Sequence, residues 1–182
     1  MVVWINGAFG VGKSSVAEAL CKRIENSYVY DPEEVGFFLW GCFPDEMKRK
    51  GDFQDMPIWR EFNRKILRYI SENFDGVVIV PMTVCVGQYF DEIVGGLRSD
   101  GVEVRHFILQ AARQTIVNRL VARGDEADGW AAMQADRCLA AFRADVVDEM
   151  VDTDGVSVDE VVGMIAEAIT TPKHQTRATT IL

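Results

Sequence analysis

The chain has 182 residues, of which 48% are hydrophobic and 26% charged, and this composition suits one folded domain with a sizeable core. Its formal net charge of −9 disfavours nonspecific binding to nucleic acid, which is a polyanion. Two histidines and four widely spaced cysteines argue against a structural zinc site. No apolar run reaches the roughly 20 residues of a transmembrane segment, so we expect a cytoplasmic protein with free thiols.

Strand-like and helix-like segments alternate along the chain. The apolar runs predict strands at residues 2–5, 28–30, 77–80, 102–109 and 149–152. The periodic segments predict helices at residues 13–25, 57–74, 89–97, 115–123, 130–143 and after a capping box formed by Ser157 and Glu160. Continuous apolar strands separated by helices are typical of a parallel sheet covered on both faces. We therefore predict one three-layer α/β domain over residues 1–170, and a polar, flexible tail at 171–182.

The stretch NGAFGVGKSS, at residues 6–15, has the pattern of a phosphate-binding loop between a strand and a helix. Glycines let the backbone N–H groups converge on a β-phosphate. Lys13 would bridge the β- and γ-phosphates, and the Ser14 hydroxyl would bind Mg²⁺. A mere glycine-rich turn with a solvated lysine would not need this strand–loop–helix context. The predicted nucleotide-binding residues of the loop are Gly7, Ala8, Phe9, Gly10, Val11, Gly12, Lys13, Ser14 and Ser15.

Asp31 ends the second predicted strand, and the carboxyl ends of parallel strands face the ligand crevice. A carboxylate there could accept a proton from an attacking hydroxyl or hold Mg²⁺ through water. Alternatively, Asp31 only caps the helix that begins at Pro32. The third strand ends in VVIVPM without an acid, which favours an acidic role for Asp31 in catalysis, substrate binding and metal binding.

Three arginines flank an acidic, glycine-bounded break at residues 124–129. Arg119 and Arg123 lie four residues apart before it, and Arg137 follows on the next helix. Small kinases use cations of a mobile lid to neutralise charge on the transferred phosphoryl group. Each arginine singly could be solvated surface charge, but the set favours a lid over about residues 119–137. We expect Arg119 and Arg123 to be catalytic and all three to contact phosphates.

Several blocks together resemble the tunicamycin-resistance ATP-binding proteins: WINGAFGVGKS, YVYDPEEVGF, DFQDMPIWREFN, IVPMT, SDGVEVRHFIL and WAAMQADRC. The similarity runs from Met1 to about Ile169, and DFQDMPIWREFN and WAAMQADRC are more specific than the loop. The resemblance implies a nucleotide-kinase-like fold that binds ATP and confers resistance to tunicamycin, a lipid-bearing nucleoside antibiotic. It also implies that Asp31 contacts a substrate hydroxyl and that Arg119 and Arg123 contact ATP phosphates. Residues Thr153, Asp154 and Gly155 would lie near adenine.

The segment from Pro32 to Arg60 is rich in aromatic residues and would shape the acceptor pocket. Apolar walls and stacking surfaces suit a lipid-tailed or nucleoside acceptor, although each aromatic could equally belong to the core. Residues 37, 38 and 40 cannot all face one side of a helix, so at least one is expected at the surface or in the pocket. The predicted substrate-binding residues, besides Asp31, are Phe37, Phe38, Trp40, Phe53, Gln54, Trp59, Arg60, Met82 and Thr83.

Three functions compete at this point. The first is an ATP- and Mg²⁺-dependent kinase that phosphorylates a hydroxyl of tunicamycin or a similar nucleoside antibiotic. The second is an ATP-dependent protein that sequesters the drug without chemistry. The third is a kinase for a small housekeeping metabolite, against which the aromatic-rich segment argues mildly.

Overall fold

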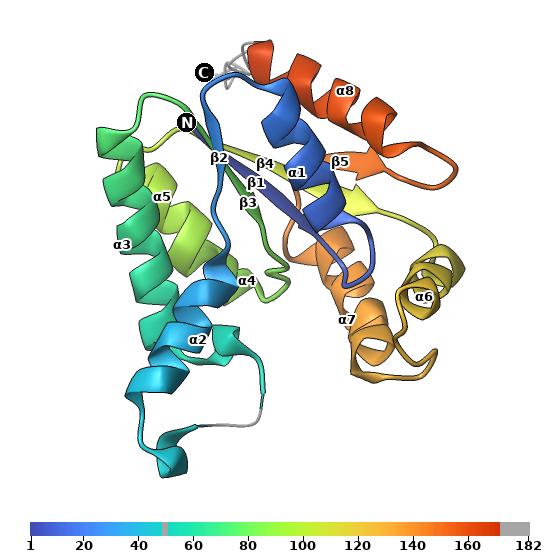
Figure 1. Cartoon of the computed structure of the whole chain (residues 1–182), viewed down its shortest axis with the longest axis horizontal. Coiled ribbons are helices and arrows are strands. Elements are labelled where there is room, and N and C mark those ends of the chain that lie inside the picture. The colour runs from blue at the N-terminus through green and yellow to red at the C-terminus, as the bar shows by residue number, and fades with distance from the viewer. Residues whose placement is uncertain (49–50, 172–182) are drawn as a thin grey trace, which may run out of the picture.

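A parallel sheet of five strands forms the centre of the molecule in the computed structural model, which describes residues 1–48 and 51–171 (Figure 1). The strand order is β2-β3-β1-β4-β5. The strands are β1 (Val2–Gly7), β2 (Ser27–Val29), β3 (Val77–Pro81), β4 (Val104–Gln110) and β5 (Glu149–Asp152). Strand β1 pairs with β3 on one side and β4 on the other, and all six of its residues are buried. The predicted parallel α/β fold is therefore confirmed.

Helices cover both faces of the sheet. Figure 1 shows α1 (Lys13–Arg23) and α8 (Val158–Thr170) in front of it, where they pack on each other, with α3 (Pro57–Asn73) behind. Behind the sheet also lies a continuous helical segment: α4 (Gly87–Phe90), a π-helical turn η3 (Asp91–Gly95) and α5 (Gly96–Ser99). This segment begins two residues earlier and ends two residues later than predicted. The expected capping box is present, because Glu160 and Ser157 bond each other's backbone N–H.

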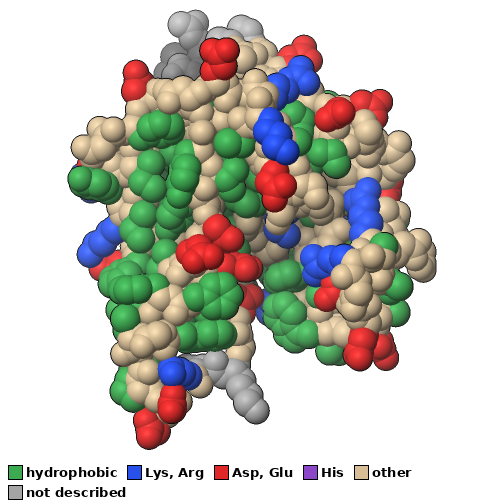
Figure 2. Space-filling model, viewed as in Figure 1, with side chains coloured by type: hydrophobic (Ala, Val, Ile, Leu, Met, Phe, Trp, Pro, Cys, Tyr) green, Lys and Arg blue, Asp and Glu red, His purple; other side chains and the backbone are tan. Residues whose placement is uncertain are grey.

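The carboxyl ends of all five strands meet at one edge of the sheet. From this edge α2 (Pro32–Cys42), followed by the short 3-10 turns η1 (Asp45–Met47) and η2 (Phe53–Asp55), extends on one side. On the other side lie α6 (Arg113–Ala122) and α7 (Trp130–Ala144). Figure 2 shows the surface hollowed between these two parts, with hydrophobic side chains on both sides and acidic side chains over the first turn of α2.

The predicted tail at residues 171–182 lies outside the described residues except for Thr171. Within residues 1–48 and 51–171, no helix has the length and apolar character needed to cross a membrane.

Candidate nucleotide site and acceptor side

The phosphate-binding loop turns sharply from β1 into α1, and three of its glycines have positive φ angles. These are Gly7 at 140°, Gly10 at 80° and Gly12 at 110°, a region that L side chains rarely adopt. A Cβ atom on Gly7 would also lie 2.7 Å from the Leu109 carbonyl oxygen of β4. The glycine spacing of the sequence is thus required by the path of the backbone.

Lys13 occupies the first position of α1, and the loop folds over its ammonium group. Its Nζ atom donates to the carbonyl oxygens of Gly7 at 3.1 Å and Ala8 at 3.0 Å, and lies 5.5 Å from the centre of the Phe9 ring. Burial lowers the pKa of Lys13 from 10.5 to about 8, while neighbouring thiols and Glu33 oppose that shift. The ammonium therefore lies inside the loop where a phosphate chain would bind.

We expect ATP affinity to fall as the pH rises above about 8. Bound phosphates favour the ammonium form, so the Lys13 pKa is higher in the complex than its value of about 8 in the free protein. The favourable interaction is then complete below pH 8 and is lost as the pH rises, by at most about tenfold per pH unit. Titration calorimetry between pH 7 and 9.5 measures this. The Lys13→Arg variant stays cationic and should give a flat profile; equal slopes in both proteins would contradict the assignment.

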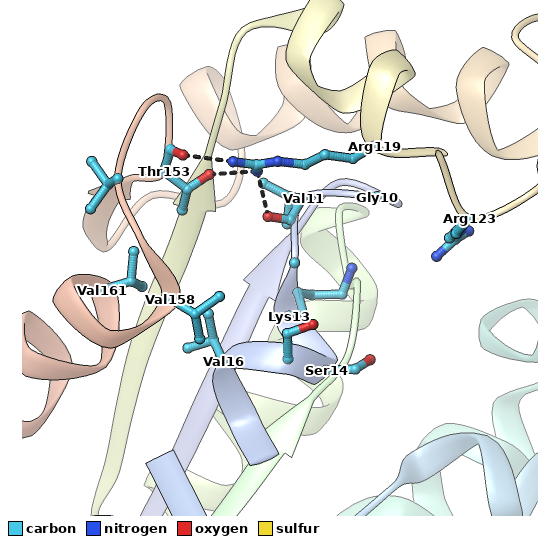
Figure 3. A pocket seen from close by; sticks show the side chains of 13 residues that line it. Gly10, Val11, Lys13, Ser14, Val16, Arg119, Arg123, Thr153, Val158 and Val161 are labelled. Carbon is cyan, nitrogen blue, oxygen red and sulfur yellow. Dashed lines mark hydrogen bonds between the residues drawn. The ribbon is translucent and has the colours of Figure 1, made fainter. Parts of the chain in front are cut away.

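A cavity of about 360 Å³ lies over the loop and the start of α1 (Figure 3). Its polar side is made by the loop, Arg119 of α6 and Arg123 just after this helix. Its apolar side is made by valines of α1, of α8 and of the turn before α8. The lining residues are Gly10, Val11, Gly12, Lys13, Ser14, Ser15, Val16, Arg119, Arg123, Thr153, Val156, Val158 and Val161. A polar end that fits phosphates beside an apolar end that fits a base suits a nucleotide.

Arg119 joins the two walls of this cavity. Its guanidinium donates to the Val11 carbonyl oxygen at 2.9 Å, to Thr153 Oγ1 at 3.0 Å and to the Thr153 carbonyl oxygen at 2.7 Å (Figure 3). The sequence placed this arginine in a mobile lid. In the structure three hydrogen bonds fix it between the phosphate loop and the turn after β5, where it forms part of the nucleotide wall.

The other two predicted arginines occupy different places. Arg123 lines the same cavity and forms an ion pair with Asp125 in the break between α6 and α7. Arg137 is exposed on α7 and does not line the cavity. The pKa of the nearby Cys85 thiol is lowered, mainly by a hydrogen bond from the Cys138 thiol at 3.4 Å and to a smaller extent by the Arg137 charge.

The remaining predicted nucleotide residues support the loop or its neighbours without lining the cavity. Ala8 is fully buried, and the Phe9 ring packs edge-on against Trp130, with ring centroids 4.9 Å apart. Asp154 accepts the Ala112 N–H at 2.6 Å, and Gly155 forms a turn with φ +67°. Sequence reasoning missed the valines of the apolar wall, because Val16 reads as the ordinary apolar face of the first helix, and Val158 and Val161 as that of the final helix.

Asp31 is the N-cap of α2, with its Oδ1 accepting the Glu33 N–H at 2.9 Å. Asp31 thus caps α2, and because the residue is exposed, its chemical role stays a prediction. Glu33, which the sequence analysis did not single out, is electrostatically coupled to Lys13. Burial and the Asp31 charge raise the Glu33 pKa, and Lys13 lowers it. The sequence signal that could have revealed it is the pair of acids, Asp31 and Glu33, on either side of Pro32.

Three of the predicted aromatics form a cluster between α2 and η2. The Phe53 ring lies 4.3 Å from Trp40 and 5.1 Å from Phe37, measured between ring centroids, and 54% of Phe37 is exposed. Phe38, which is 61% exposed, turns to another hollow between α2 and α3, lined also by Val35 and Phe62. The structure thus brings Phe37, Trp40 and Phe53 together and separates Phe38 from them.

Trp59, Gln54 and Arg60 are buried and bond neighbouring protein groups, so their contact with substrate stays a prediction that this structure does not display. Trp59 is fully buried and its indole N–H donates to the Pro32 carbonyl oxygen at 2.9 Å. Arg60 bonds Glu92 and the Gln54 carbonyl oxygen and stacks on the Tyr89 ring. These side chains hold α2, η2 and α3 together beneath the acceptor side.

Met82 and Thr83 support the phosphate loop from below, and both are almost completely buried. The Met82 carbonyl oxygen accepts the Trp4 indole N–H at 3.1 Å. The Thr83 hydroxyl donates to the Gly7 carbonyl oxygen at 2.8 Å, the same oxygen that Lys13 contacts. They adjoin the site, but their burial argues against direct contact with an acceptor.

The aromatic cluster gives a stability test with a matched control on the same helix. A Cβ atom at Gly36 would lie 2.4 Å from the Phe53 ring, whereas one at Gly41 would meet nothing within 4 Å. We expect Gly36→Ala to lower the free energy of unfolding by about 1–3 kcal/mol through overpacking. Gly41→Ala should instead raise it by up to about 1 kcal/mol, because alanine favours helix. Urea unfolding measures both; equal effects would contradict the packing.

Comparisons with known proteins agree with this geometry. A family model described as AAA domain matches residues 2–144. The structure of a tunicamycin resistance protein from Deinococcus radiodurans superposes with a TM-score of 0.80 and 30% identity, covering 94% of this chain and 96% of that chain. A gluconokinase from Sinorhizobium meliloti 1021 has a TM-score of 0.61 and 17% identity, covering 95% and 97% of the two chains.

A shikimate kinase from Bacteroides thetaiotaomicron likewise has a TM-score of 0.61 and 17% identity, covering 94% of this chain and 99% of that chain. Likeness at 17% identity establishes the shared fold. The search of curated protein sequences found no match. Fold and site together define a P-loop kinase-like domain of the AAA domain class. Within that class, the chain belongs to the tunicamycin-resistance ATP-binding protein family.

Proposed function

We propose that the protein is an ATP-dependent phosphotransferase that moves the γ-phosphoryl group to a hydroxyl of tunicamycin or a similar nucleoside antibiotic. The observation that carries the proposal is the position of Lys13, whose environment includes both the nucleotide cavity and the acid Glu33 of α2. The acceptor is inferred from the 30% identity to a tunicamycin resistance protein.

In the proposed reaction, ATP places its base against the valine wall and its phosphates in the loop. Lys13 then exchanges its carbonyl partners for phosphate oxygens, and Arg123 adds positive charge at the cavity edge. The acceptor oxygen forms a bond to the γ-phosphorus while the bond to the β–γ bridging oxygen breaks, which releases ADP. The free oxygen of Asp31, or the neighbouring Glu33 carboxylate, receives the hydroxyl proton.

The residues present fit Mg²⁺ that arrives with the nucleotide. Across residues 1–48 and 51–171, no three His, Cys, Asp or Glu side chains form a cluster that could hold a metal ion. Mg²⁺ in phosphate-transfer sites needs few protein ligands, since phosphate oxygens and water supply most of them. The Ser14 hydroxyl at the cavity and the exposed carboxylate of Asp31 would be its protein ligands. Bound Mg²⁺ would neutralise phosphate charge during transfer.

The charge of the acceptor side supports an uncharged or cationic acceptor. Asp31, Glu33 and Asp52 interact electrostatically around the start of α2. In the described part of residues 32–60, the cations are engaged elsewhere: Arg60 pairs with Glu92, and Lys48 with Asp45. A carboxylate acceptor would meet repulsion there. The exposed Phe37 face offers a stacking surface for a nucleoside base.

ATP-dependent sequestration remains the second candidate, and the capping role of Asp31 favours it, because one carboxylate oxygen is already used. An ADP-release assay with several acceptors distinguishes the functions. We expect sustained, acceptor-dependent ADP release with tunicamycin and none above background with gluconate or shikimate. Release with the two acids but not with tunicamycin would assign a housekeeping kinase. ATP-dependent drug binding without ADP release would assign sequestration.

A further inference from the structure

The residue before the phosphate loop, Asn6, is fully buried, and its side-chain amide connects strands β1 and β4 with the segment that follows β3. Its Oδ1 accepts the backbone N–H of Gly7 at 2.9 Å and of Val84 at 2.9 Å. Its Nδ2 donates to the Val84 carbonyl oxygen at 2.9 Å. The amide therefore clamps the first residue of the loop to the segment that follows β3.

The remaining N–H of this amide points to His106 of β4, with Nδ2 and Nε2 3.1 Å apart. Because Oδ1 accepts two backbone N–H groups, the orientation of the amide is determined, and Nδ2 must be the donor toward the imidazole. His106 Nε2 must then carry a lone pair. In a neutral imidazole the proton consequently lies on Nδ1, which is 3.5 Å from Asp148 Oδ2.

Asp148 is itself held in place at the entry to β5. The Arg98 guanidinium of α5 donates to Asp148 Oδ2 at 2.8 Å, and Asp148 Oδ1 accepts the N–H of Glu149 at 3.2 Å. The imidazole, which is fully buried, also packs on the Phe90 ring with centroids 4.6 Å apart. The ring thus faces Asp148, the residue before β5, with Nδ1 and contacts Asn6 with Nε2.

We infer that His106 is a positioning residue of the nucleotide site, which holds Asn6, and through it Gly7, in the geometry that the phosphate loop needs. Gly7 has a φ of 140°, and its carbonyl oxygen accepts from both Thr83 and Lys13. A shift of Asn6 would move this oxygen and with it the Lys13 ammonium. The inference rests only on nucleotide binding at the loop, so it does not depend on the identity of the acceptor.

The tautomer of His106 is the first test. The sequence contains only two histidines, so long-range ¹H–¹⁵N spectra of histidine-labelled protein give two ring systems, and the His174→Gln variant assigns them. We expect His106 at neutral pH to be protonated on Nδ1 with Nε2 free. An Nε2-protonated ring or an imidazolium would overturn the inference, because neither could accept from Asn6.

The second test measures the dissociation constant of Mg-ATP. His106→Phe keeps a planar ring but leaves the Asn6 donor unpaired, so we expect affinity to fall by about 5- to 100-fold. His106→Gln offers an acceptor oxygen and should restore affinity to within about threefold of the wild type. Ser27→Ala is the stability control. It removes a hydroxyl that bonds Cys21 and Ile24 at the amino end of β2, whereas the phosphate loop follows the carboxyl end of β1. Equal affinity in the wild type and His106→Phe would refute the inference, and so would equal losses of affinity in the Phe and Gln variants. If His106→Phe does not fold, the tautomer of His106 in the wild type tests the inference alone.

Discussion

Replacing Lys13 with alanine is expected to reduce phosphoryl transfer by on the order of 10²–10³-fold and to weaken ATP binding. The lysine supplies the only ammonium group among the described residues that line the cavity. Its attraction to phosphate is strongest where water is excluded. Steady-state kinetics with saturating acceptor, together with calorimetric ATP titration, measure the two effects separately.

Lys22→Ala is the matched control for this experiment. Lys22 lies in the last turn of the same helix, α1, so its removal changes the net charge equally without touching the cavity. We expect it to retain wild-type turnover. If Lys13→Ala retained turnover as well, the loop would bind nucleotide in another way and the proposed chemistry would be wrong.

Replacing Asp31 with asparagine should lower turnover by about 10²–10⁴-fold while leaving stability nearly unchanged. Asparagine caps a helix about as well as aspartate, so the bond to the Glu33 N–H is retained and only the charged, basic oxygen is lost. Kinetics and thermal unfolding of the same protein samples measure both quantities. Asp31→Ala should in addition cost about 1 kcal/mol of stability through the lost cap.

Glu33→Gln identifies which carboxylate receives the proton. If Asp31→Asn kept full turnover and Glu33→Gln abolished it, the role would belong to Glu33, whose pKa is lowered by the Lys13 charge although burial and Asp31 raise it more. If both variants kept turnover, neither acid would be the base. Retained drug binding without transfer in the wild type would then favour sequestration.

The fold and the nucleotide side could be predicted from sequence because they rest on local patterns. The glycine spacing of residues 7–12 specifies the backbone path, and continuous apolar strands specify a parallel sheet. Asp31 was placed correctly at the carboxyl end of β2 by the same reasoning, since every parallel strand ends at that edge.

The acceptor side was harder to predict, because burial depends on contacts between distant segments. Trp59 and Arg60 lie on the long amphipathic helix α3, but only the three-dimensional structure shows that they bond Pro32 and Glu92. The role of Arg119 depends in the same way on Thr153, 34 residues later. Composition suggested an aromatic-rich pocket without showing which rings face inward.

The central claim is that the protein catalyses transfer and does not merely bind the drug. The most direct measurement incubates the protein with Mg-ATP and a large excess of tunicamycin, and follows the drug by mass spectrometry. We predict that many drug molecules per protein molecule gain one phosphoryl group, and that Lys13→Ala abolishes this gain. Unmodified drug, bound at no more than one molecule per protein molecule, would contradict the proposal.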